Sequence, residues 1–429
     1  MLHRNRVWMC LAVFLLAFGV RFSLIATTPK YDNSIDLEIY RAGGGLIAKG
    51  VNPYDYAAGL VEREALRSRT TQATLKDPAL WNYYASSNLP LTLLFFGGIT
   101  SIHDSALAYR YTFAVLDSFL SLFVFLFVLD HWTSQSLVGQ RDSTLSRFSG
   151  AAFGFYGRLL MGLGLSALSP TLLKWGTIFP EDKGIQTLLM VFALACILSS
   201  NRRIAAYGAP VVVGLSIAYK GLGIFLLPLF IARLLSHNPR SLRRIASSIS
   251  LCIMASCIWF LPFGVSLVLQ MGRGRLLGNS VRLPQHASIW VWVARYMPDH
   301  WNIVRIGFMA ALLCVACVGY ARRRFGLGVV TSVAMVAFVV VWLTGGSMDR
   351  VNIGVMISIL LLGRHSVRAA LPALIIYFSM GAAGMFSRGE DLESIGLLLW
   401  AITFAMVVAR SAFRRQPTAP SLGWAGDRP

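Results

Sequence analysis

The sequence predicts an all-α protein that crosses a membrane many times. Hydrophobic residues make up 56% of the 429 residues and charged residues only 14%, against about 25% charged residues in a typical soluble domain. The mean hydropathy is +0.62. Apolar runs of about 20 residues, the length that crosses about 30 Å of hydrocarbon, recur from Val7 to Val408. These observations favour one membrane domain over residues 1–415, followed by a disordered cytoplasmic tail at 416–429.

The order of apolar and polar segments predicts about twelve membrane-spanning helices. The first covers about residues 7–27, and a long first external loop, 28–105, follows it. A short apolar piece, Leu89–Ile102, lies within that loop. The other spans are expected at about 106–129, 150–168, 184–200, 205–235 (two short helices), 245–266, 302–320, 327–344, 351–363, 369–387 and 393–411.

The segment from Ala205 to Leu235 is expected to form a helical hairpin. It exceeds 30 residues and has arginines on both flanks. If both flanks lie on the same side of the membrane, the chain must turn back within the segment. The sequence Lys220-Gly-Leu-Gly223 is the natural turn, because paired glycines interrupt helices.

Charge asymmetry between alternate loops sets the predicted orientation, since cytoplasmic loops carry an excess of Lys and Arg. The basic strips include Arg141, Arg147, Arg202, Arg203, Arg240, Arg243, Arg244, Arg322, Arg364, Arg368, Arg414 and Arg415. The opposite loops collect most of the acids. This alternation requires that Leu89–Ile102, about 14 residues, is re-entrant or lies on the surface. Both termini are then cytoplasmic, and the acids face outward.

Other sequence features argue against several classes of protein. The net charge is +20, but the basic residues flank apolar runs instead of forming a nucleic-acid-binding surface, so no nucleic-acid partner is expected. All six cysteines lie in apolar runs and are assigned to packing, including the Cys314/Cys317 pair. The seven histidines show no ligand spacing. Neither a metal nor a cofactor is predicted, and the first helix is expected to be retained.

The first external loop begins with a candidate site. Ser34 can cap a short helix with Asp36 and Glu38 in its first turn, where acids suit the helix dipole. Tyr40 follows Asp36 by four residues and shares its helix face. A carboxylate beside an aromatic ring could bind a sugar, with the ring stacked on a pyranose. A capped surface helix carrying a solvated acid is the alternative.

The loop resembles the first external loop of GT-C glycosyltransferases. The string Asp36-Leu-Glu-Ile-Tyr40, followed by Gly50-Val-Asn-Pro-Tyr54-Asp, is closest to the family 87 polyprenyl-phosphate-mannose-dependent type. Leu89-Pro90-Leu91, the Ser169-Pro170 … Asp182 turn and Lys220 with Leu226-Leu227-Pro228 fit the same pattern. Asn88 and the single proline depart from it. The resemblance covers roughly residues 1–236.

The resemblance implies a GT-C-like bundle in the plasma (inner) membrane, with an active site on the extracytoplasmic face. It implies an inverting transfer of a hexose, with mannose favoured, from a polyprenyl-phosphate donor to a glycan or glycolipid acceptor. Asp36 would be the catalytic base. Tyr40, Tyr54, Glu181 and Asp182 would bind the sugar or the acceptor. Asp182 would orient the acceptor or a basic residue, with N-capping of the next span as the alternative.

The leaving phosphate would need cationic groups to hold its charge. Lys220, at the predicted hairpin turn, is one candidate, and snorkelling to the interface is the alternative. The others form a basic external cluster that a solvated loop would also explain: Arg273, Arg275, Arg282 and His286.

Four further charges near or within the spans are expected to be mainly structural. Arg110 and Asp117 are seven residues apart and are predicted to brace each other, and Arg21 and Arg158 complete the set.

Two other functions stay open. The chain could be a multi-pass transporter or a lipid or glycolipid flippase, although no second broken helix marks an inverted repeat. It could also be a non-catalytic assembly subunit.

Overall fold

The computed structural model describes residues 2–32, 34–55, 88–132, 157–237 and 242–265, with isolated residues between 267 and 379. Regular structure in these segments is helical throughout. Three of the described helices are long and apolar enough to cross a membrane, at Arg6–Thr27, Ala106–Asp130 and Leu242–Phe263. The chain is therefore a helical membrane protein. The predicted spans beyond residue 267 and the predicted tail lie outside the segments described continuously.

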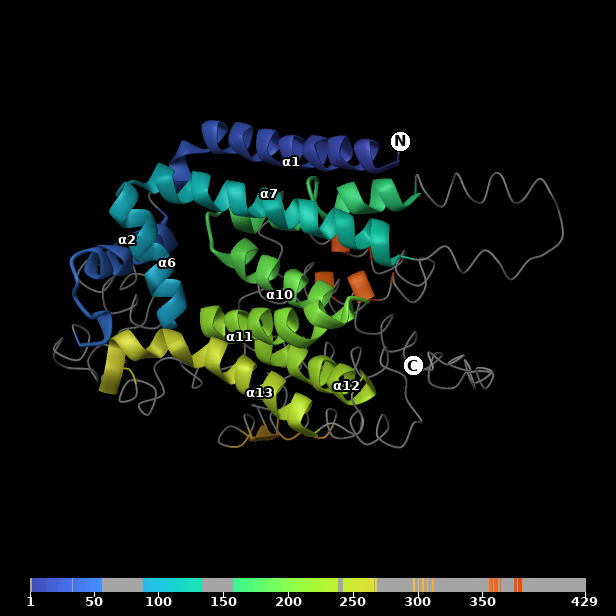
Figure 1. Cartoon of the computed structure of the whole chain (residues 1–429). Helices are drawn as coiled ribbons and strands as arrows, with labels where there is room; N and C mark the ends of the chain where they lie inside the picture. Colours follow the sequence, from blue (N-terminus) through green and yellow to red (C-terminus); the bar gives the residue numbers. More distant parts are fainter. Residues whose placement is uncertain are drawn as a thin grey trace, which may run out of the picture.

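Helices α1 (Leu2–Thr27) and α7 (Ala106–His131) run side by side in opposite directions (Figure 1). At one end Arg6 pairs with Asp130 across 2.5 Å. At the other end Arg110 of α7 donates a hydrogen bond to the carbonyl of Thr28 at 3.0 Å. The outer face of α1 exposes large apolar side chains such as Leu15, which is 55% exposed. That face suits lipid, where apolar exposure carries no penalty.

Helices α10 (Lys183–Leu198), α11 (Ala209–Lys220) and α12 (Leu227–His237) form the centre of the bundle. Helix α11 ends at Gly221, whose φ of 77° is the left-handed conformation that commonly stops a helix. A 3₁₀ segment, Leu222–Leu226, then leads into α12. Residues of α12 line the same cavity as the residues that precede α11. The chain has therefore turned back, which confirms the predicted hairpin and its turn at Lys220–Gly223.

Helix α13 (Leu242–Cys257) packs along α11 in the same direction (Figure 1). Ser248 donates to the carbonyl of Ala206 at 3.3 Å, and Ser256 donates to the carbonyl of Gly214 at 3.2 Å. A Cβ at Gly214 would lie 2.6 Å from the Cys252 carbonyl. Small residues and hydroxyl groups thus let the two backbones approach closely, as they do between membrane helices.

Helices α2 (Ile35–Ala48) and α6 (Pro90–Ile102) pack against each other at one end of the bundle (Figure 1). The contact is close because Gly44 faces Phe96 and Gly97 faces Ile47, leaving no room for a Cβ at either glycine. The predicted short helix at 89–102 is confirmed as a 13-residue helix. Whether it crosses the membrane stays a prediction.

The two ends of the bundle carry different charges. Asp32, Asp36, Glu181 and Asp182 lie at the end where α2 packs. At the opposite end Arg6 pairs with Asp130, and the described residues there include a set of arginines, namely Arg6, Arg158, Arg202, Arg203, Arg233 and Arg244. This separation agrees with the predicted division into acidic and basic loops.

Candidate functional site

Local sequence determines how α2 presents its acids. Ser34 precedes the helix in an extended conformation, and its hydroxyl accepts a hydrogen bond from the Leu37 amide at 3.4 Å. Asp36 and Glu38 occupy the first turn, near the positive end of the helix dipole. The predicted capped helix is confirmed. Asp36 is exposed, whereas Leu37 and Tyr40 are buried.

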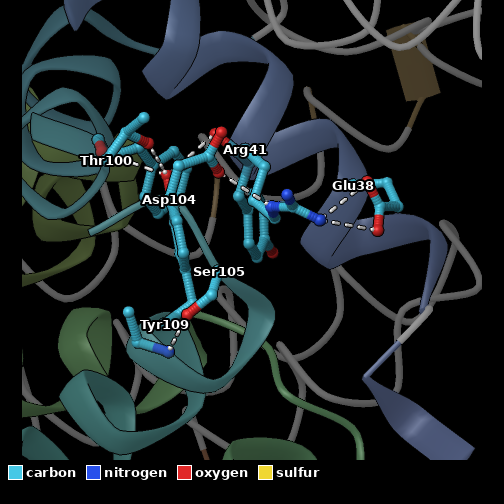
Figure 2. Close-up of polar contacts among 9 residues, drawn as sticks. Glu38, Arg41, Thr100, Asp104, Ser105 and Tyr109 are labelled. Atoms are coloured by element: carbon cyan, nitrogen blue, oxygen red, sulfur yellow. Dashed lines mark hydrogen bonds and ion pairs between the residues drawn. The ribbon is translucent and has the colours of Figure 1, made fainter.

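A second set of contacts holds α2 against the junction of α6 and α7 (Figure 2). Arg41 donates to Glu38 at 3.1 Å and to Asp104 at 3.0 Å. The buried hydroxyl of Tyr109, on α7, lies 3.2 Å from the Tyr40 carbonyl and 3.0 Å from the Phe96 carbonyl. Arg41 and Tyr109 therefore both hold the helix that carries Asp36 against the junction of α6 and α7.

Asp182 is the centre of the site. Its carboxylate is fully buried and accepts hydrogen bonds from the hydroxyls of Tyr40 and Tyr219, both at 3.1 Å. The ammonium of Lys220 lies 2.5 Å from Asp182 Oδ1. Three elements far apart in the chain therefore meet at one carboxylate: α2, the turn before α10, and the C-terminus of α11.

The electrostatics of the site favour an ionised Asp182. Burial alone would raise the pKa of this carboxyl, but the ammonium groups of Lys220 and Lys183, with hydrogen bonds from Lys220 and Tyr219, outweigh burial and lower the pKa below its usual value. The pKa of Tyr40 is raised well above its usual value by burial and by the negative charges of Asp182, Asp36 and Glu181. Tyr40 therefore acts as a hydrogen-bond donor. The three carboxylates lie close enough to act on one ring.

The structure gives Tyr40 a different role from the predicted one. Tyr40 is 4% exposed, its ring is stacked on Phe96 with centroids 4.4 Å apart, and the Lys220 nitrogen lies 5.8 Å from the ring centroid. The ring is thus enclosed by protein and is not a surface on which a pyranose could stack. Tyr40 instead ties α2 to Asp182.

Tyr54 likewise serves the fold of the first loop. It is fully buried, and its hydroxyl donates to the Asn88 carbonyl at 2.7 Å. Its ring meets Phe263 edge to face, with centroids 5.2 Å apart. Tyr54 therefore joins the two described ends of the 28–105 loop to the 3₁₀ segment that follows α13, Ile258–Phe263, and its contact with a sugar stays a prediction.

The two acids predicted in the turn before α10 have different partners. Asp182 occupies the N-cap position, but its side chain makes no capping hydrogen bond and points to Lys220 instead. Of the three roles expected for Asp182, this geometry excludes N-capping and agrees with orienting a basic residue, and orienting the acceptor stays a prediction. Glu181 pairs with Lys183 across 2.7 Å, and both side chains are only 12–13% exposed.

The predicted Arg110–Asp117 brace is wrong. Arg110 contacts Asp32 at 2.5 Å and the backbone carbonyl of Thr177 at 3.2 Å. Asp117 faces Arg21 of α1, with 3.8 Å between Nε and Oδ2. Both residues do lie on the inner face of α7, but partners from other elements reach them. The structural role expected of Arg158 agrees with its hydrogen bond to the Trp132 carbonyl, at 3.0 Å, at the end of α7.

No sequence pattern points to two residues of the site, and four of the predicted site residues lie outside the described segments. Tyr219 and Arg41 had no signal beyond their nearness to Lys220 and Glu38. The basic cluster predicted to hold phosphate lies outside the described residues, namely Arg273, Arg275, Arg282 and His286. Within the described part of the chain, no group of three or more His, Cys, Asp or Glu side chains is arranged to hold a metal ion.

The arrangement combines an exposed carboxylate with a buried, charged support. Asp36 can accept a proton from a bound hydroxyl group, while the Asp182–Lys220 pair keeps a cation close to the same helix.

Comparison of the chain with models of protein families finds no matching family, and comparison with curated proteins finds no match.

Proposed function

We propose that the chain is an inverting glycosyltransferase of the GT-C type, with about twelve spans, that uses a polyprenyl-phosphate-linked sugar. The observation that carries this proposal is the convergence of Asp36 with the Asp182–Lys220 pair at the acidic end of the bundle. Asp36 is exposed on α2, and the buried face of the same helix contacts that pair through Tyr40. A base and a cation near one another are the two groups that displacement of a phosphate by a hydroxyl requires.

In the proposed reaction, Asp36 removes the proton of the acceptor hydroxyl as its oxygen attacks C1 of the sugar. The new C1–O bond forms while the bond from C1 to the phosphate oxygen breaks, and the electron pair leaves with the lipid phosphate. The anomeric centre is inverted because one displacement occurs. One carboxylate suffices, unlike the paired acids of glycoside hydrolysis.

The buried residues would act by positioning. Asp182, with the two tyrosine hydroxyls, holds Lys220 at the end of α11. Lys220 is then the described cation best placed to meet a phosphate, with further cations expected from the cluster at 273–286. Mannose is the favoured hexose on the sequence resemblance alone. An extracytoplasmic glycan or glycolipid would be the acceptor.

The proposed membrane orientation puts this end outside the plasma (inner) membrane. The opposite end carries the arginines, and Lys and Arg are enriched on the cytoplasmic side. A lipid-linked donor suits an outward-facing site, where nucleotide sugars are not normally present.

The test is transfer of a labelled sugar from polyprenyl-phosphate donors to candidate acceptors by the purified protein. We expect Asp36→Asn to lower the transfer rate by about 10²- to 10⁴-fold, the range for loss of a general base. Glu38→Gln is the matched control, because Glu38 occupies the same first turn and pairs with Arg41. Its rate should stay within a few-fold of the wild type. Full transfer by Asp36→Asn would exclude Asp36 as the base.

Transport or lipid flipping is the second candidate, favoured by the buried pair between Arg21 and Asp117 inside the bundle. Ionisable groups within membrane helices often mark a transport path. The same purified protein in liposomes separates the two functions. Translocation of a labelled lipid-linked sugar without any transfer product would favour transport, and loss of that translocation in Asp117→Asn would connect it to the pair.

A further inference from the structure

The basic end of the bundle contains a cavity of about 320 Å³ between α10, the segment before α11, α12 and α13. Its polar lining comprises four arginines, one tyrosine and two serines, namely Arg202, Arg203, Arg233, Arg244, Tyr207, Ser247 and Ser248. Among the described residues that line it, there is no acidic side chain. The volume lies at the lower end of the range of small-ligand sites, about 300–1,000 Å³.

Four guanidinium groups line this one cavity, and their positive charges attract an anion that enters it. Arginine binds phosphate through two parallel hydrogen bonds and is weakly hydrated, so it suits this task better than lysine. The cavity therefore has the charge and the donor chemistry of a phosphate-binding site.

The surroundings favour a phosphate that belongs to a lipid. Tyr207, which lines the cavity, is 66% exposed, and the neighbouring Ile204 and Ile249 are 43% and 38% exposed. These side chains offer an apolar surface beside the arginines. A soluble anion would gain nothing from that surface, whereas acyl chains would cover it.

The cavity is separate from the acidic site. Helix α11 begins beside the cavity and ends at Lys220, and its 12 residues cover about 18 Å at 1.5 Å per residue. An occupant of the cavity therefore does not contact the Asp182–Lys220 pair. The positive-inside rule assigns the arginine-rich end to the cytoplasmic leaflet, where anionic lipids are enriched.

We propose that this cavity binds the phosphate headgroup of an anionic phospholipid of the cytoplasmic leaflet, with the acyl chains lying against Ile204, Tyr207 and Ile249. The site is independent of the proposed glycosyl transfer. Basic pockets between membrane helices on this side commonly hold anionic headgroups. The four arginines provide the charge, and Ser247 and Ser248 add hydroxyl groups.

The experiment is native mass spectrometry of the purified full-length protein with equimolar phosphatidylglycerol and phosphatidylcholine. The wild type should retain phosphatidylglycerol preferentially. The double variant Arg203→Gln/Arg244→Gln should lower that preference by about tenfold, since it removes charge-assisted hydrogen bonds to phosphate. Arg243→Gln is the matched control. Arg243 is exposed on the same helix turn as Arg244 but does not line the cavity, so this variant should behave like the wild type.

Three outcomes would overturn the proposal. The first is equal retention of the two lipids by the wild type. The second is an equal loss in Arg243→Gln, which would indicate general surface attraction. The third is displacement of phosphatidylglycerol by an equal concentration of inorganic phosphate, which would identify a site for a soluble anion. Arg203 and Arg244 are both exposed, and an unchanged thermal midpoint of the double variant in lipid-free detergent would verify its fold.

Discussion

The two buried ion pairs of this bundle differ in their distance and in how many of their polar atoms have hydrogen-bond partners. The Asp182–Lys220 pair joins the turn before α10 to the end of α11 at 2.5 Å. Two tyrosine hydroxyls also donate hydrogen bonds to the Asp182 carboxylate. The Arg21–Asp117 pair joins α1 to α7 at 3.8 Å. There, Arg21 Nε, Arg21 Nη2 and Asp117 Oδ2 have no hydrogen-bond partner among the described residues.

The difference indicates that only the first pair is organised to hold a charge in one position. A buried pair offsets the loss of hydration when its geometry is good and its remaining donors and acceptors are satisfied. Asp182 meets that condition with three donors. The Arg21–Asp117 pair does not, although Arg21 also donates to the Ala17 carbonyl at 3.0 Å. We expect the first pair to be rigid and the second to be replaceable.

The largest effect is expected from Asp182→Asn. The amide can still accept from the tyrosines but cannot neutralise Lys220, and breaking a buried pair lowers the free energy of unfolding by about 3–5 kcal/mol. Thermal or chemical unfolding in detergent measures the loss. Asp104→Asn is the control, since Asp104 pairs with Arg41 at the surface and should contribute about 1 kcal/mol or less. Equal losses in the two variants would remove the distinction between a buried and a surface pair.

A smaller effect is expected from Gly184→Ala, which tests how tightly Asp117 is enclosed. A Cβ at Gly184 would overlap the Asp117 carboxylate, which also lies against Gly176. Overpacking of this kind lowers stability by about 1–3 kcal/mol. In Gly45→Ala the new Cβ on α2 would meet nothing within 4 Å, so the greater helix propensity of alanine should raise stability by about 0.5–1 kcal/mol. If the unfolding midpoints of Gly184→Ala and Gly45→Ala moved in the same direction, the tight enclosure of Asp117 would be contradicted.

The smallest net effect is expected from replacing both members of the Arg21–Asp117 pair. Asp117→Leu alone leaves Arg21 buried without a counter-charge and should destabilise the protein strongly. The double variant Arg21→Met/Asp117→Leu should return to within about 1 kcal/mol of the wild type, because apolar residues often replace a buried pair without loss. A double-mutant cycle on unfolding measures this coupling. A double variant as unstable as Asp117→Leu would show that the charges themselves are needed.

Features that depend on neighbouring residues were predictable from the sequence. The Ser34 cap and the first turn of α2 follow from a serine hydroxyl and the backbone amide three residues after it. The hairpin followed from the length of 205–235, its flanking arginines and the glycines after Lys220. The prediction for Arg110 and Asp117 failed because their spacing specifies a shared helix face but not a contact. Long arginine side chains reached partners on other elements.

The sequence by itself determined that this is a helical membrane protein, and it separated acidic from basic loops, because hydropathy and charge are properties of each segment. Only the tertiary structure decided which charges meet. Asp182 lies 142 residues from Tyr40 and 38 from Lys220, and no local pattern relates residues at those separations. Helix packing brings them together, and burial then requires each polar group to find a partner. Tyr40, which the sequence suggested as a sugar-binding residue, is buried and for this reason donates its hydrogen bond to Asp182.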